Sequence, residues 1–385
     1  MIYREDKKSN NKLSILGLGC MRFPRDKSET ERMILAAIEG GVNFFDTAYI
    51  YPGSEVTLGE ILAKHNKRKD IYIATKLPLI KCKTYDDFDK YFNEQLRRLK
   101  TDYIDYYFLH SMTDNAQWVA LQEMGIKDWI AKKIEAGQIK QIGFSYHGIY
   151  DDFIKIIDSY PWEFCMIQYN YYDENYQAGK RGLKAAAEKG MSVIVMEPLL
   201  GGRLATGLPK QAVDIFKKAD ETLTPADWAF RWLWNHEEVT VALSGMSSTQ
   251  IMEANIHSAN NFQKLTSKAV YEEVVKIFRK SYKINCTGCN YCLPCPMGIN
   301  IPACFTAYNT RYAQGFVTGM TLYATSTAII RKNSTSPRKC NQCGKCEKIC
   351  PQNIPIRKSL KIVSRRMEPL PMRLGFAIVR KVISR

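Results

Sequence analysis

The chain of 385 residues has no uninterrupted apolar stretch near the ~20 residues that a membrane-spanning helix needs. Residues 1–12 are polar and charged, and they lack the apolar centre of a secretory signal peptide. The 12 cysteines are too clustered for the disulfide framework of a small secreted protein. We therefore expect no transmembrane segment and a reducing, cytoplasmic location.

Acidic residues are scarce in the C-terminal part of the chain. Residues 286–385 hold 16 Lys and Arg but only 2 Asp and Glu, whereas residues 1–285 hold 39 and 37. Most of the net charge of +16 therefore lies in the last hundred residues. Nucleic acid is the first partner that such a basic region suggests.

Eight cysteines form two runs with the spacing of metal ligands. The runs read Cys286-x2-Cys289-x2-Cys292-x2-Cys295-Pro296 and Cys340-x2-Cys343-x2-Cys346-x3-Cys350-Pro351. In two-cluster ferredoxins, three thiolates at this spacing bind one [4Fe-4S] cube, and the fourth, before a proline, binds the other. The predicted ligand sets are Cys286, Cys289, Cys292 and Cys350 for cluster one, and Cys340, Cys343, Cys346 and Cys295 for cluster two.

Two alternatives to these ligand sets stay open. Zinc sites with four cysteines also begin with C-x2-C, although the repeated two-residue spacing and the Cys-Pro ends favour iron-sulfur. The first run is one residue short before Cys295, so Cys304 is a second candidate for that ligand. The proline after Cys295 favours Cys295.

Two iron-sulfur clusters would reduce the net positive charge of the basic C-terminal region. A [4Fe-4S] cube with four thiolates carries a charge of about −2 when oxidised, so two cubes cancel part of the positive charge. The remaining charge is suited to attract an acidic electron carrier of the ferredoxin or flavodoxin kind. We therefore expect no nucleic acid, and two interpretations of the remaining charge stay open, namely a docking surface for such a carrier and a basic face that only solvent contacts.

The first 260 residues alternate short apolar runs with segments of helical spacing. The runs are Ile15–Gly19, Val42–Phe45, Ile71–Thr75, Ile104–Leu109, Ile139–Phe144, Phe164–Gln168, Val193–Met196 and Val239–Leu243. They are rich in Val, Ile, Phe and Tyr and mostly apolar throughout, as buried parallel strands are. Helices are expected between them, for example over Thr30–Glu39, Tyr85–Leu99, Trp118–Ala136 and Tyr176–Lys189. Eight repeats of strand and helix predict a (β/α)8 barrel rather than an open doubly wound sheet.

The change of pattern after the barrel predicts the domain organisation. We expect the barrel over 1–262, a connecting helix over 263–283, a ferredoxin-type two-cluster domain over 284–359 and a basic amphipathic tail over 360–385. The small domain should be mainly helical, because the segment between the cysteine runs has no clear strand pattern. The apolar side chains from Leu374 to Ile383 could line a helix that packs on the barrel or touches a membrane or partner.

Chemically capable side chains stand where several predicted strands end. Asp46, Lys76 and His110 each follow an apolar run directly, and Tyr51 lies five residues after Asp46. Each has an ordinary structural explanation alone, such as a helix cap, a surface ion pair or a core histidine. In a (β/α)8 barrel, however, these positions share the C-terminal rim, where active sites lie.

These residues also carry a resemblance to a known family. Asp46-Thr-Ala-Tyr-Ile-Tyr51-Pro-Gly-Ser-Glu55 resembles the Asp-Thr-Ala-x-x-Tyr-x-x-Ser-Glu signature of the aldo-keto reductase superfamily. Lys76 and Leu109-His110 stand where that family has the rest of its catalytic tetrad. The resemblance covers residues 12–260, and with the cysteine runs the chain is similar to the iron-sulfur members of the superfamily.

The resemblance implies an enzyme that reduces a small carbonyl substrate with NAD(P)H. Tyr51 is the expected proton donor, and a free tyrosine with a pKa of about 10 needs help to exchange protons near neutral pH. A neighbouring Lys76 cation favours the phenolate, and Asp46 holds that cation in place. His110 is expected to orient the carbonyl and to stabilise the negative charge that develops on its oxygen.

Six cofactor-binding positions follow from the same resemblance, namely Ser145, Gln168, Met196, Gly245, Ser247 and Asn255. Ser145 and Gln168 correspond to residues that hold the nicotinamide carboxamide, and Met196 replaces a tyrosine that usually stacks on the ring. His147 stands near the first of these, and it could contact cofactor or substrate or be an ordinary loop residue.

The adenosine end of the cofactor is less clearly specified. Ser244-Gly-Met-Ser-Ser and Asn255 resemble the segment that holds the adenosine phosphate in the family. Ile251 and Ala254 replace an arginine and a glutamate that are common there, so the sequence favours neither NADPH nor NADH.

One alternative function comes from another class of protein. The barrel could bind nucleotide and turn over slowly, which would make the chain a redox-responsive sensor or binding protein. The intact set of Asp46, Tyr51, Lys76 and His110 favours the enzyme.

Overall fold

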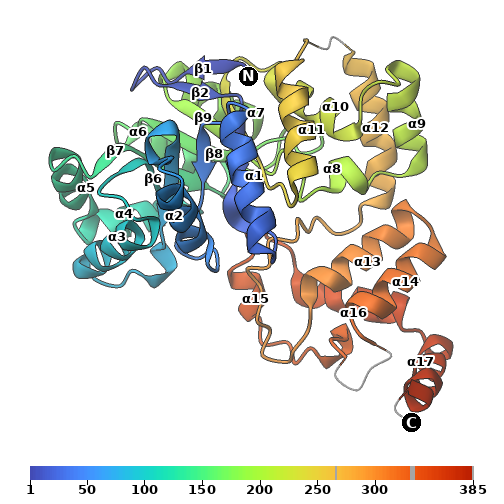
Figure 1. Ribbon diagram of the computed structural model, residues 1–385. Coiled ribbons are helices and arrows are strands. Elements are labelled where there is room, and N and C mark those ends of the chain that lie inside the picture. Colours follow the sequence, from blue (N-terminus) through green and yellow to red (C-terminus); the bar gives the residue numbers. More distant parts are fainter. Residues whose placement is uncertain (265–266, 330–333, 384–385) are drawn as a thin grey trace. The chain divides into compact units, whose positions relative to one another are not determined.

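The computed structural model describes residues 1–264, 267–329 and 334–383, with side chains described as far as residue 376. The chain divides into two compact units, one formed by Met1–Pro198 with Ala229–Leu265 and the other by Leu199–Trp228 with Thr266–Arg385 (Figure 1). This division differs from the expected boundary after residue 262. The segment Leu199–Trp228 belongs to the second unit because its helix α9 (Lys210–Ala219) packs on α12 (Lys268–Ser281).

A closed barrel of eight parallel strands forms the centre of the first unit (Figure 1). Neighbouring strands follow the order β10-β3-β4-β5-β6-β7-β8-β9. Their bounds are β3 Leu16–Gly19, β4 Phe44–Asp46, β5 Tyr72–Leu77, β6 Ile104–Met112, β7 Ile139–Tyr146, β8 Phe164–Gln168, β9 Ser192–Met196 and β10 Val239–Ser244. Each of the eight predicted runs overlaps one strand, so the predicted (β/α)8 barrel is confirmed.

Large side chains fill the interior of the barrel. Phe108 and Phe164 contact edge to face with ring centroids 4.7 Å apart, and Tyr106 contacts Phe164 in the same way at 5.1 Å. Phe44 and Ile194 belong to the same fully buried cluster. The interior is therefore a packed core rather than a pore, and it leaves the rim as the place for chemistry.

Helices surround the barrel in the pattern that the sequence predicts. In the first unit they are α1 Lys27–Glu39, α2 Ser54–Lys64, α3 Tyr85–Leu99, α4 Asn115–Glu123, α5 Ile126–Glu135, α6 Tyr150–Asp158, α7 Gly179–Glu188 and α11 Thr249–Asn260. The helical segment expected over 118–136 contains two of these, α4 and α5. Gly125 between them has φ +86°, a left-handed conformation that glycine adopts without steric cost and that ends the first helix.

An N-terminal hairpin, which the sequence did not indicate, closes the amino-terminal end of the barrel. It consists of β1 (Tyr3–Glu5) and β2 (Lys12–Ser14), which pair antiparallel. Asp6 is fully buried and accepts hydrogen bonds from Tyr106 Oη and Ser192 Oγ, both at 2.8 Å. Because these two residues lie near the starts of β6 and β9, the hairpin covers the end opposite to the expected active-site rim.

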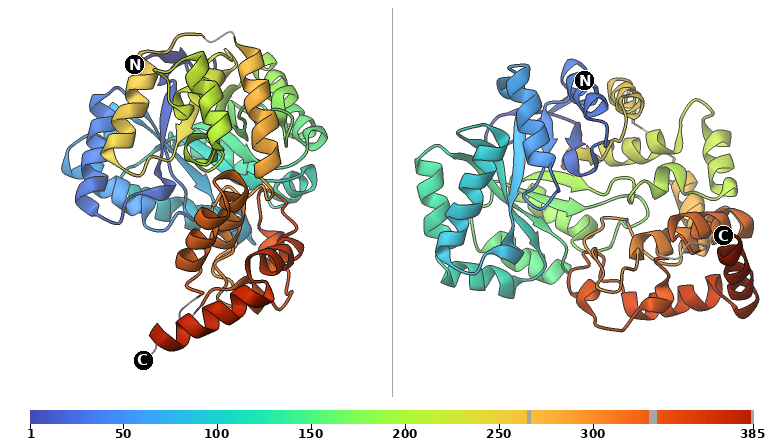
Figure 2. Two further views of the ribbon diagram at one scale, coloured as in Figure 1. Left: turned by 90° about the vertical axis from the view of Figure 1, so that its right-hand side faces the viewer. Right: turned by 60° about the horizontal axis from the view of Figure 1, so that its bottom comes forward.

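The described residues of the second unit form helices joined by irregular segments, with no strand among them. Its helices are α8 Arg203–Thr206, α9, α12, α13 Ile301–Ala313, α14 Phe316–Ser326, α15 Lys345–Lys348, α16 Ile356–Met367 and α17 Leu370–Ile383, and the division between the units falls inside α10 Pro225–Trp234. Helices α13 and α14 lie side by side in both Figure 1 and Figure 2. They share an apolar core with α16 that includes Phe305, Tyr323 and Leu360. The predicted mainly helical domain is confirmed.

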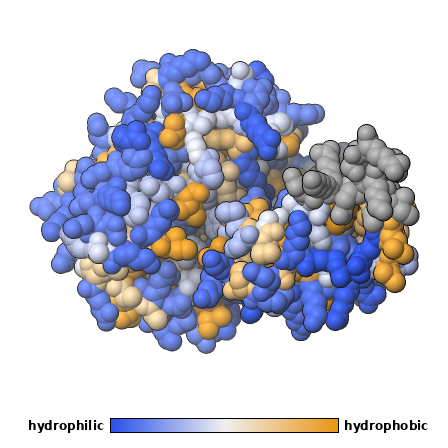
Figure 3. Space-filling view, turned by 90° about the horizontal axis from the view of Figure 1, so that it is seen from below, coloured by the Kyte–Doolittle hydropathy of each residue, from blue (hydrophilic) through white to orange (hydrophobic). Residues whose placement is uncertain are grey.

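The amphipathic tail predicted over 360–385 falls within α16 and α17. Leu374 is exposed, whereas Phe376 packs at the edge of the core of the second unit. The remaining predicted apolar positions up to Ile383 lie outside the residues whose side chains are described. No helix in the described part of the chain is long and apolar enough to cross a membrane. Hydrophilic residues cover most of the face shown in Figure 3, with hydrophobic residues among them in small groups.

Candidate functional site

A buried ion pair lies at the carboxyl ends of two adjacent strands. Asp46 is the last residue of β4, and Lys76 lies near the end of β5, which pairs with β4 in parallel. Lys76 Nζ donates to Asp46 Oδ1 at 2.5 Å and to the backbone oxygen of Thr47 at 2.7 Å. Both side chains are almost fully buried. The lysine is thus held in one position by two acceptors from the neighbouring strand and loop.

Tyr51 and His110 complete the group that the sequence predicts. Tyr51 lies in the loop between β4 and α2, and Lys76 Nζ is 5.1 Å from the centre of its ring. His110 lies in β6, and its ring is 6.0 Å from that of Tyr51, at an interplanar angle of 85°. The structure therefore brings Asp46, Tyr51, Lys76 and His110 together at one place on the rim.

Burial sets the protonation behaviour of this group. It lowers the pKa of the Lys76 ammonium and raises the pKa of the Asp46 carboxyl, and each partner's charge opposes the other's shift. Burial, assisted by the nearby Lys76 charge, holds the pKa of His110 well below its ordinary value of 6.5. The imidazole is therefore neutral near pH 7, and a neutral ring keeps one N–H that can donate a hydrogen bond.

Hydrogen bonds with Gln95 and Glu55 hold the strand that carries Lys76. Gln95 of α3 donates to the backbone oxygen of Lys76 at 3.1 Å and to Glu55 Oε1 at 2.7 Å. Glu55 also accepts from Thr75 Oγ1 at 2.7 Å and forms an ion pair with Arg98 at 3.1 Å. Glu55 of the predicted signature therefore orients strand β5. No motif in the sequence pointed to Gln95, which lies on a helix.

A second histidine is buried beside the tetrad. His147 follows β7, and its backbone N–H donates to Met112 O at 2.8 Å. Burial lowers the pKa of His147 to about 4, and a hydrogen bond with Gln177 partly opposes this shift. His147 Nδ1 is buried without a hydrogen-bond partner among the described residues. A buried nitrogen of this kind fits a polar group of a bound molecule.

The six expected cofactor positions lie at the carboxyl ends of β7, β8 and β9, in the segment after β10 and on α11. Ser145 Oγ accepts from the backbone N–H of Ser111 at 2.7 Å, and Gln168 Nε2 donates to Asp173 Oδ2 at 3.0 Å. Met196 ends β9 and is partly exposed beside the barrel core. All three stand on the same rim as the tetrad, as one extended cofactor requires.

The adenosine end of the expected cofactor site lies around the N-terminus of α11. Asn255 Nδ2 donates to Ser244 Oγ at 3.1 Å, which ties the helix to the end of β10. Gly245 and Ser247 are exposed between them, and a Cβ added to Gly245 would meet no atom within 4 Å. The residues present therefore leave open space for a ligand at this segment.

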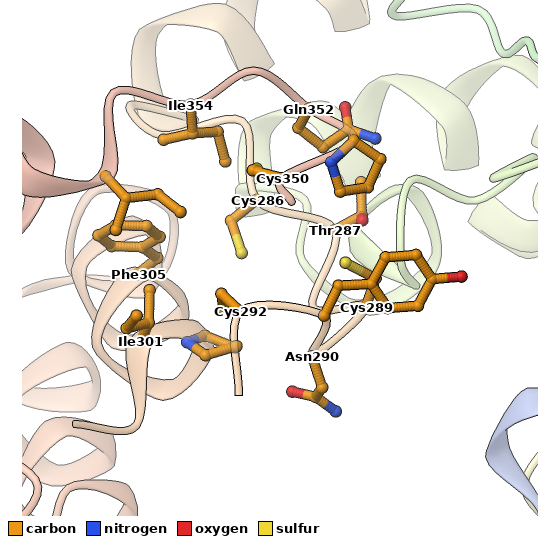
Figure 4. A pocket seen from close by; sticks show the side chains of 14 residues that line it. Cys286, Thr287, Cys289, Asn290, Cys292, Ile301, Phe305, Cys350, Gln352 and Ile354 are labelled. Atoms are coloured by element: carbon orange, nitrogen blue, oxygen red, sulfur yellow. The ribbon is translucent and has the colours of Figure 1, made fainter. Parts of the chain in front are cut away.

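The four cysteines predicted for cluster one line a single pocket of the second unit. Cys286, Cys289 and Cys292 come from the segment between α12 and α13, and Cys350 comes from the segment before α16. Figure 4 shows these side chains around a common space of about 330 Å³, part of it open to solvent. The apolar side of the pocket is formed by residues that include Ile301, Phe305 and Ile354.

The surroundings of Cys286 favour a neutral thiol until a metal binds. Burial raises the pKa of Cys286 to about 12, and the nearby Arg203 guanidinium partly opposes the shift. Arg203 Nη2 donates to Thr306 Oγ1 of α13 at 2.5 Å, which holds the charge in place. Four thiols around an apolar pocket are a donor set that fits an iron-sulfur cube.

The cysteines predicted for cluster two are more exposed. Cys343 is exposed, whereas Cys295, Cys340 and Cys346 are partly buried. Cys340 and Cys295 both act on the Cys346 thiol electrostatically, so the first run does reach the second. Among the described residues, no three potential ligands converge closely enough to hold a single metal ion. The thiolates of a cube each bind a different iron, so they do not need to converge.

Cys304 does not line the pocket formed by Cys286, Cys289, Cys292 and Cys350. It is fully buried in α13, and its Sγ donates to the backbone oxygen of Thr335 at 3.8 Å. It packs in the apolar core with Phe305 and Tyr323. This environment suits a structural thiol better than a ligand.

Comparison with known proteins agrees with both parts of this description. Residues 15–277 match the model of the aldo/keto reductase family, which is more than half of the chain. The chain belongs to the aldo/keto reductase family. Residues 285–355 match the model of a 4Fe-4S dicluster domain, so this reductase also carries an iron-sulfur domain.

Relatives of this aldo/keto reductase match along most of their own length. YqkF of Bacillus subtilis (strain 168), named an uncharacterized oxidoreductase, is 27% identical over 312 residues, which cover 70% of this chain and 93% of that one. L-galactose dehydrogenase of Arabidopsis thaliana is 26% identical over 283 residues, with coverages of 64% and 83%. Among solved structures, aldo-keto reductase AKR11C1 from Bacillus halodurans in its holo form gives a TM-score of 0.59 at 26% identity, covering 71% of this chain and 96% of that one.

Family membership confirms part of what the sequence predicted. The chain is an NAD(P)H-dependent oxidoreductase of the aldo/keto reductase type with an iron-sulfur domain. The roles of individual residues, the number of clusters and the choice between NADH and NADPH stay predictions.

Proposed function

We propose that this aldo/keto reductase reduces a small carbonyl compound, with Tyr51 as the proton donor. The observation that carries the proposal is the buried Lys76–Asp46 pair, whose ammonium lies 5.1 Å from the centre of the Tyr51 ring. A cation held at that position stabilises negative charge on the phenolic oxygen. When bound at this rim, a nicotinamide cofactor would supply the hydride for the carbonyl carbon.

The tetrad accounts for the proton that this reaction needs. Tyr51 Oη gives its proton to the carbonyl oxygen, so the product is an alcohol and the tyrosine becomes a phenolate. Lys76 stabilises the phenolate until solvent returns the proton. Asp46 keeps the ammonium charged in a buried place, because without this carboxylate the pKa of Lys76 would fall further.

His110 acts on the carbonyl oxygen as a neutral donor. Its depressed pKa means that the ring carries no charge of its own at pH 7. An N–H directed at the oxygen orients the carbonyl and stabilises the negative charge that develops there. His147, with a buried unpartnered Nδ1, is suited to hold a second polar group of substrate or cofactor.

We assign the cofactor positions as the resemblance implies. Ser145 and Gln168 would hold the carboxamide, Met196 would pack against the nicotinamide ring, and Gly245, Ser247 and Asn255 would hold the adenosine phosphate. In the second unit, Cys286, Cys289, Cys292 and Cys350 would hold one [4Fe-4S] cluster, and Cys340, Cys343, Cys346 and Cys295 the other. The clusters supply one-electron transfer, and we propose that they exchange electrons with a separate carrier because hydride moves two electrons at once.

The test of the proton donor is a pair of tyrosine variants. Tyr51→Phe should lower kcat for reduction of an aldehyde panel by several orders of magnitude while NADH and NADPH still bind, because only the proton donor is lost. Tyr49→Phe is the matched control, since its ring contacts Tyr91 and Arg98 instead of the tetrad. Equal turnover by the Tyr51→Phe enzyme would remove Tyr51 from this role.

A further inference from the structure

The two cysteine groups of the second unit differ in their access to solvent. Cys286 is buried, and the pocket of its group is lined by apolar residues such as Phe305 and Ile354. In the other group, Cys343 is exposed, and so are its neighbours Asn341 and Gln342. Electron transfer between proteins becomes faster as centres come closer, so the group around Cys343 is the more accessible of the two to a partner.

Positive side chains surround this exposed cysteine group. Arg338 and Lys339 precede Cys340, Lys345 and Lys348 lie on α15, and all four are exposed. We call these four residues the basic rim. Lys339 Nζ donates to the backbone oxygen of Ser334, and none of the four forms an ion pair among the described residues.

The carboxylates of this part of the chain do not neutralise the basic rim. Residues 286–385 contain only Glu347 and Glu368. Glu347 forms an ion pair with Arg357 at 2.7 Å. Glu368 is buried and accepts hydrogen bonds from Tyr323 at 2.5 Å and Ser336 at 2.6 Å. The positive charge of the rim is therefore free to act on a partner.

We propose that the basic rim docks an acidic one-electron carrier protein against the cluster held by Cys295, Cys340, Cys343 and Cys346. In each encounter one electron passes from the reduced carrier to the cluster, so that the carrier is oxidised by one electron and the cluster is reduced by one. No proton and no covalent bond are involved. The proposal rests on the cluster assignment in the proposed function, and it adds the docking face and the charge of the partner.

An acidic protein fits the rim better than nucleic acid does. The charges flank the one exposed cysteine of the group, where a redox partner gains from close approach and a phosphate backbone gains nothing. Proteins that bind single-stranded nucleic acid without sequence preference combine a basic groove with aromatic side chains on which the bases stack. Between Arg338 and Lys348 the sequence contains no aromatic residue.

The test is the anaerobic reduction of the clusters in the holoenzyme by reduced flavodoxin, followed by visible absorption at low and high salt. We expect the bimolecular rate constant to fall with salt and to drop about tenfold in Lys345→Glu/Lys348→Glu. Lys276→Glu/Lys280→Glu on α12 makes the same change of charge at two other exposed lysines and should keep the wild-type rate. Reduction by dithionite should be equally complete in all variants, which shows that both clusters are present.

A second variant guards against an effect on cluster assembly. Arg338→Glu/Lys339→Glu changes the two residues of the basic rim that precede Cys340. This variant should show the same decrease in the bimolecular rate constant and keep its full iron content. Equal slowing by the α12 variant, or a wild-type rate constant that does not fall with salt, would overturn the proposal. Displacement of flavodoxin by duplex DNA at the same lysines would assign the rim to nucleic acid instead. Because cluster reduction is measured without a carbonyl, failure here is distinct from failure of the role of Tyr51.

Discussion

The carboxylate of Glu29 accepts a hydrogen bond from the backbone N–H of Thr249 at 2.7 Å. Glu29 lies on α1 and Thr249 is the first residue of α11, so two helices far apart in the sequence meet at the expected adenosine end of the cofactor site. This contact and the neighbouring Arg32 lower the pKa of Glu29. A negative charge therefore already occupies the N-terminus of α11, where a 2′-phosphate would need positive surroundings.

We predict from this contact that the enzyme binds NADH more tightly than NADPH. Glu29→Gln should improve NADPH affinity by about fivefold or more and leave NADH affinity nearly unchanged, because one like charge near the 2′-phosphate is removed. Quenching of protein fluorescence by each cofactor measures both dissociation constants. Tighter binding of NADPH than NADH by the wild type would contradict the prediction.

Arg203 is expected to set the reduction potential of cluster one. Its guanidinium lies near Cys286 and is fixed by Thr306, so Arg203→Met removes a positive charge beside that cluster. Reduction adds negative charge to the cluster, and a nearby positive charge favours it. The reduction potential of cluster one should therefore fall in Arg203→Met and stay closer to the wild-type value in Arg203→Lys. EPR-monitored redox titration measures this. An unchanged potential in Arg203→Met would show that the charge does not act on the cluster.

The low pKa of His110 predicts how the reductase activity depends on pH. Because burial depresses the pKa below 6.5, the neutral ring persists as the pH falls through that value and becomes charged only well below it. The kcat/KM for an aldehyde should therefore show no loss with a midpoint near 6.5. If the kcat/KM of the wild type falls with a midpoint near 6.5 and this fall is absent in His110→Gln, then the pKa of His110 is not depressed.

Cys295 and Cys304 should differ sharply in their effect on iron content. Cys295 acts electrostatically on Cys346, whereas Cys304 lies on α13 and packs in the apolar core of the second unit. We expect Cys295→Ala to lose about half of the bound iron and sulfide and Cys304→Ala to keep all of it. Iron and sulfide analysis of anaerobically reconstituted protein decides this, and the reverse pattern would make Cys304 the ligand.

Local sequence patterns predicted the barrel because each strand has its own apolar run. They also placed Asp46, Tyr51, Lys76 and His110 on one rim, since the ends of parallel strands meet there. They could not predict the hairpin β1–β2, because its buried Asp6 depends on partners in β6 and β9. Polar side chains reveal such roles only when distant partners are known.

The same reason explains the residues that sequence reasoning missed. Gln95, Glu29 and Arg203 each act through contacts with residues distant in the chain, and none lies in a motif. The grouping of Leu199–Trp228 with the iron-sulfur unit is also a matter of packing. The cysteine runs were readable because their ligands are close in sequence, and the ferredoxin spacing also predicts the exchange of Cys295 and Cys350 between the clusters.

The most direct test of the account follows hydride from cofactor to product. Holoenzyme is incubated anaerobically with an aldehyde panel and NADH that carries deuterium at both hydrogens of the nicotinamide C4. We predict an alcohol with one deuterium on the former carbonyl carbon from the wild type, and almost none from Tyr51→Phe. Alcohol without deuterium, formed while the clusters become oxidised, would show that the electrons reach the carbonyl by another route and would contradict the account.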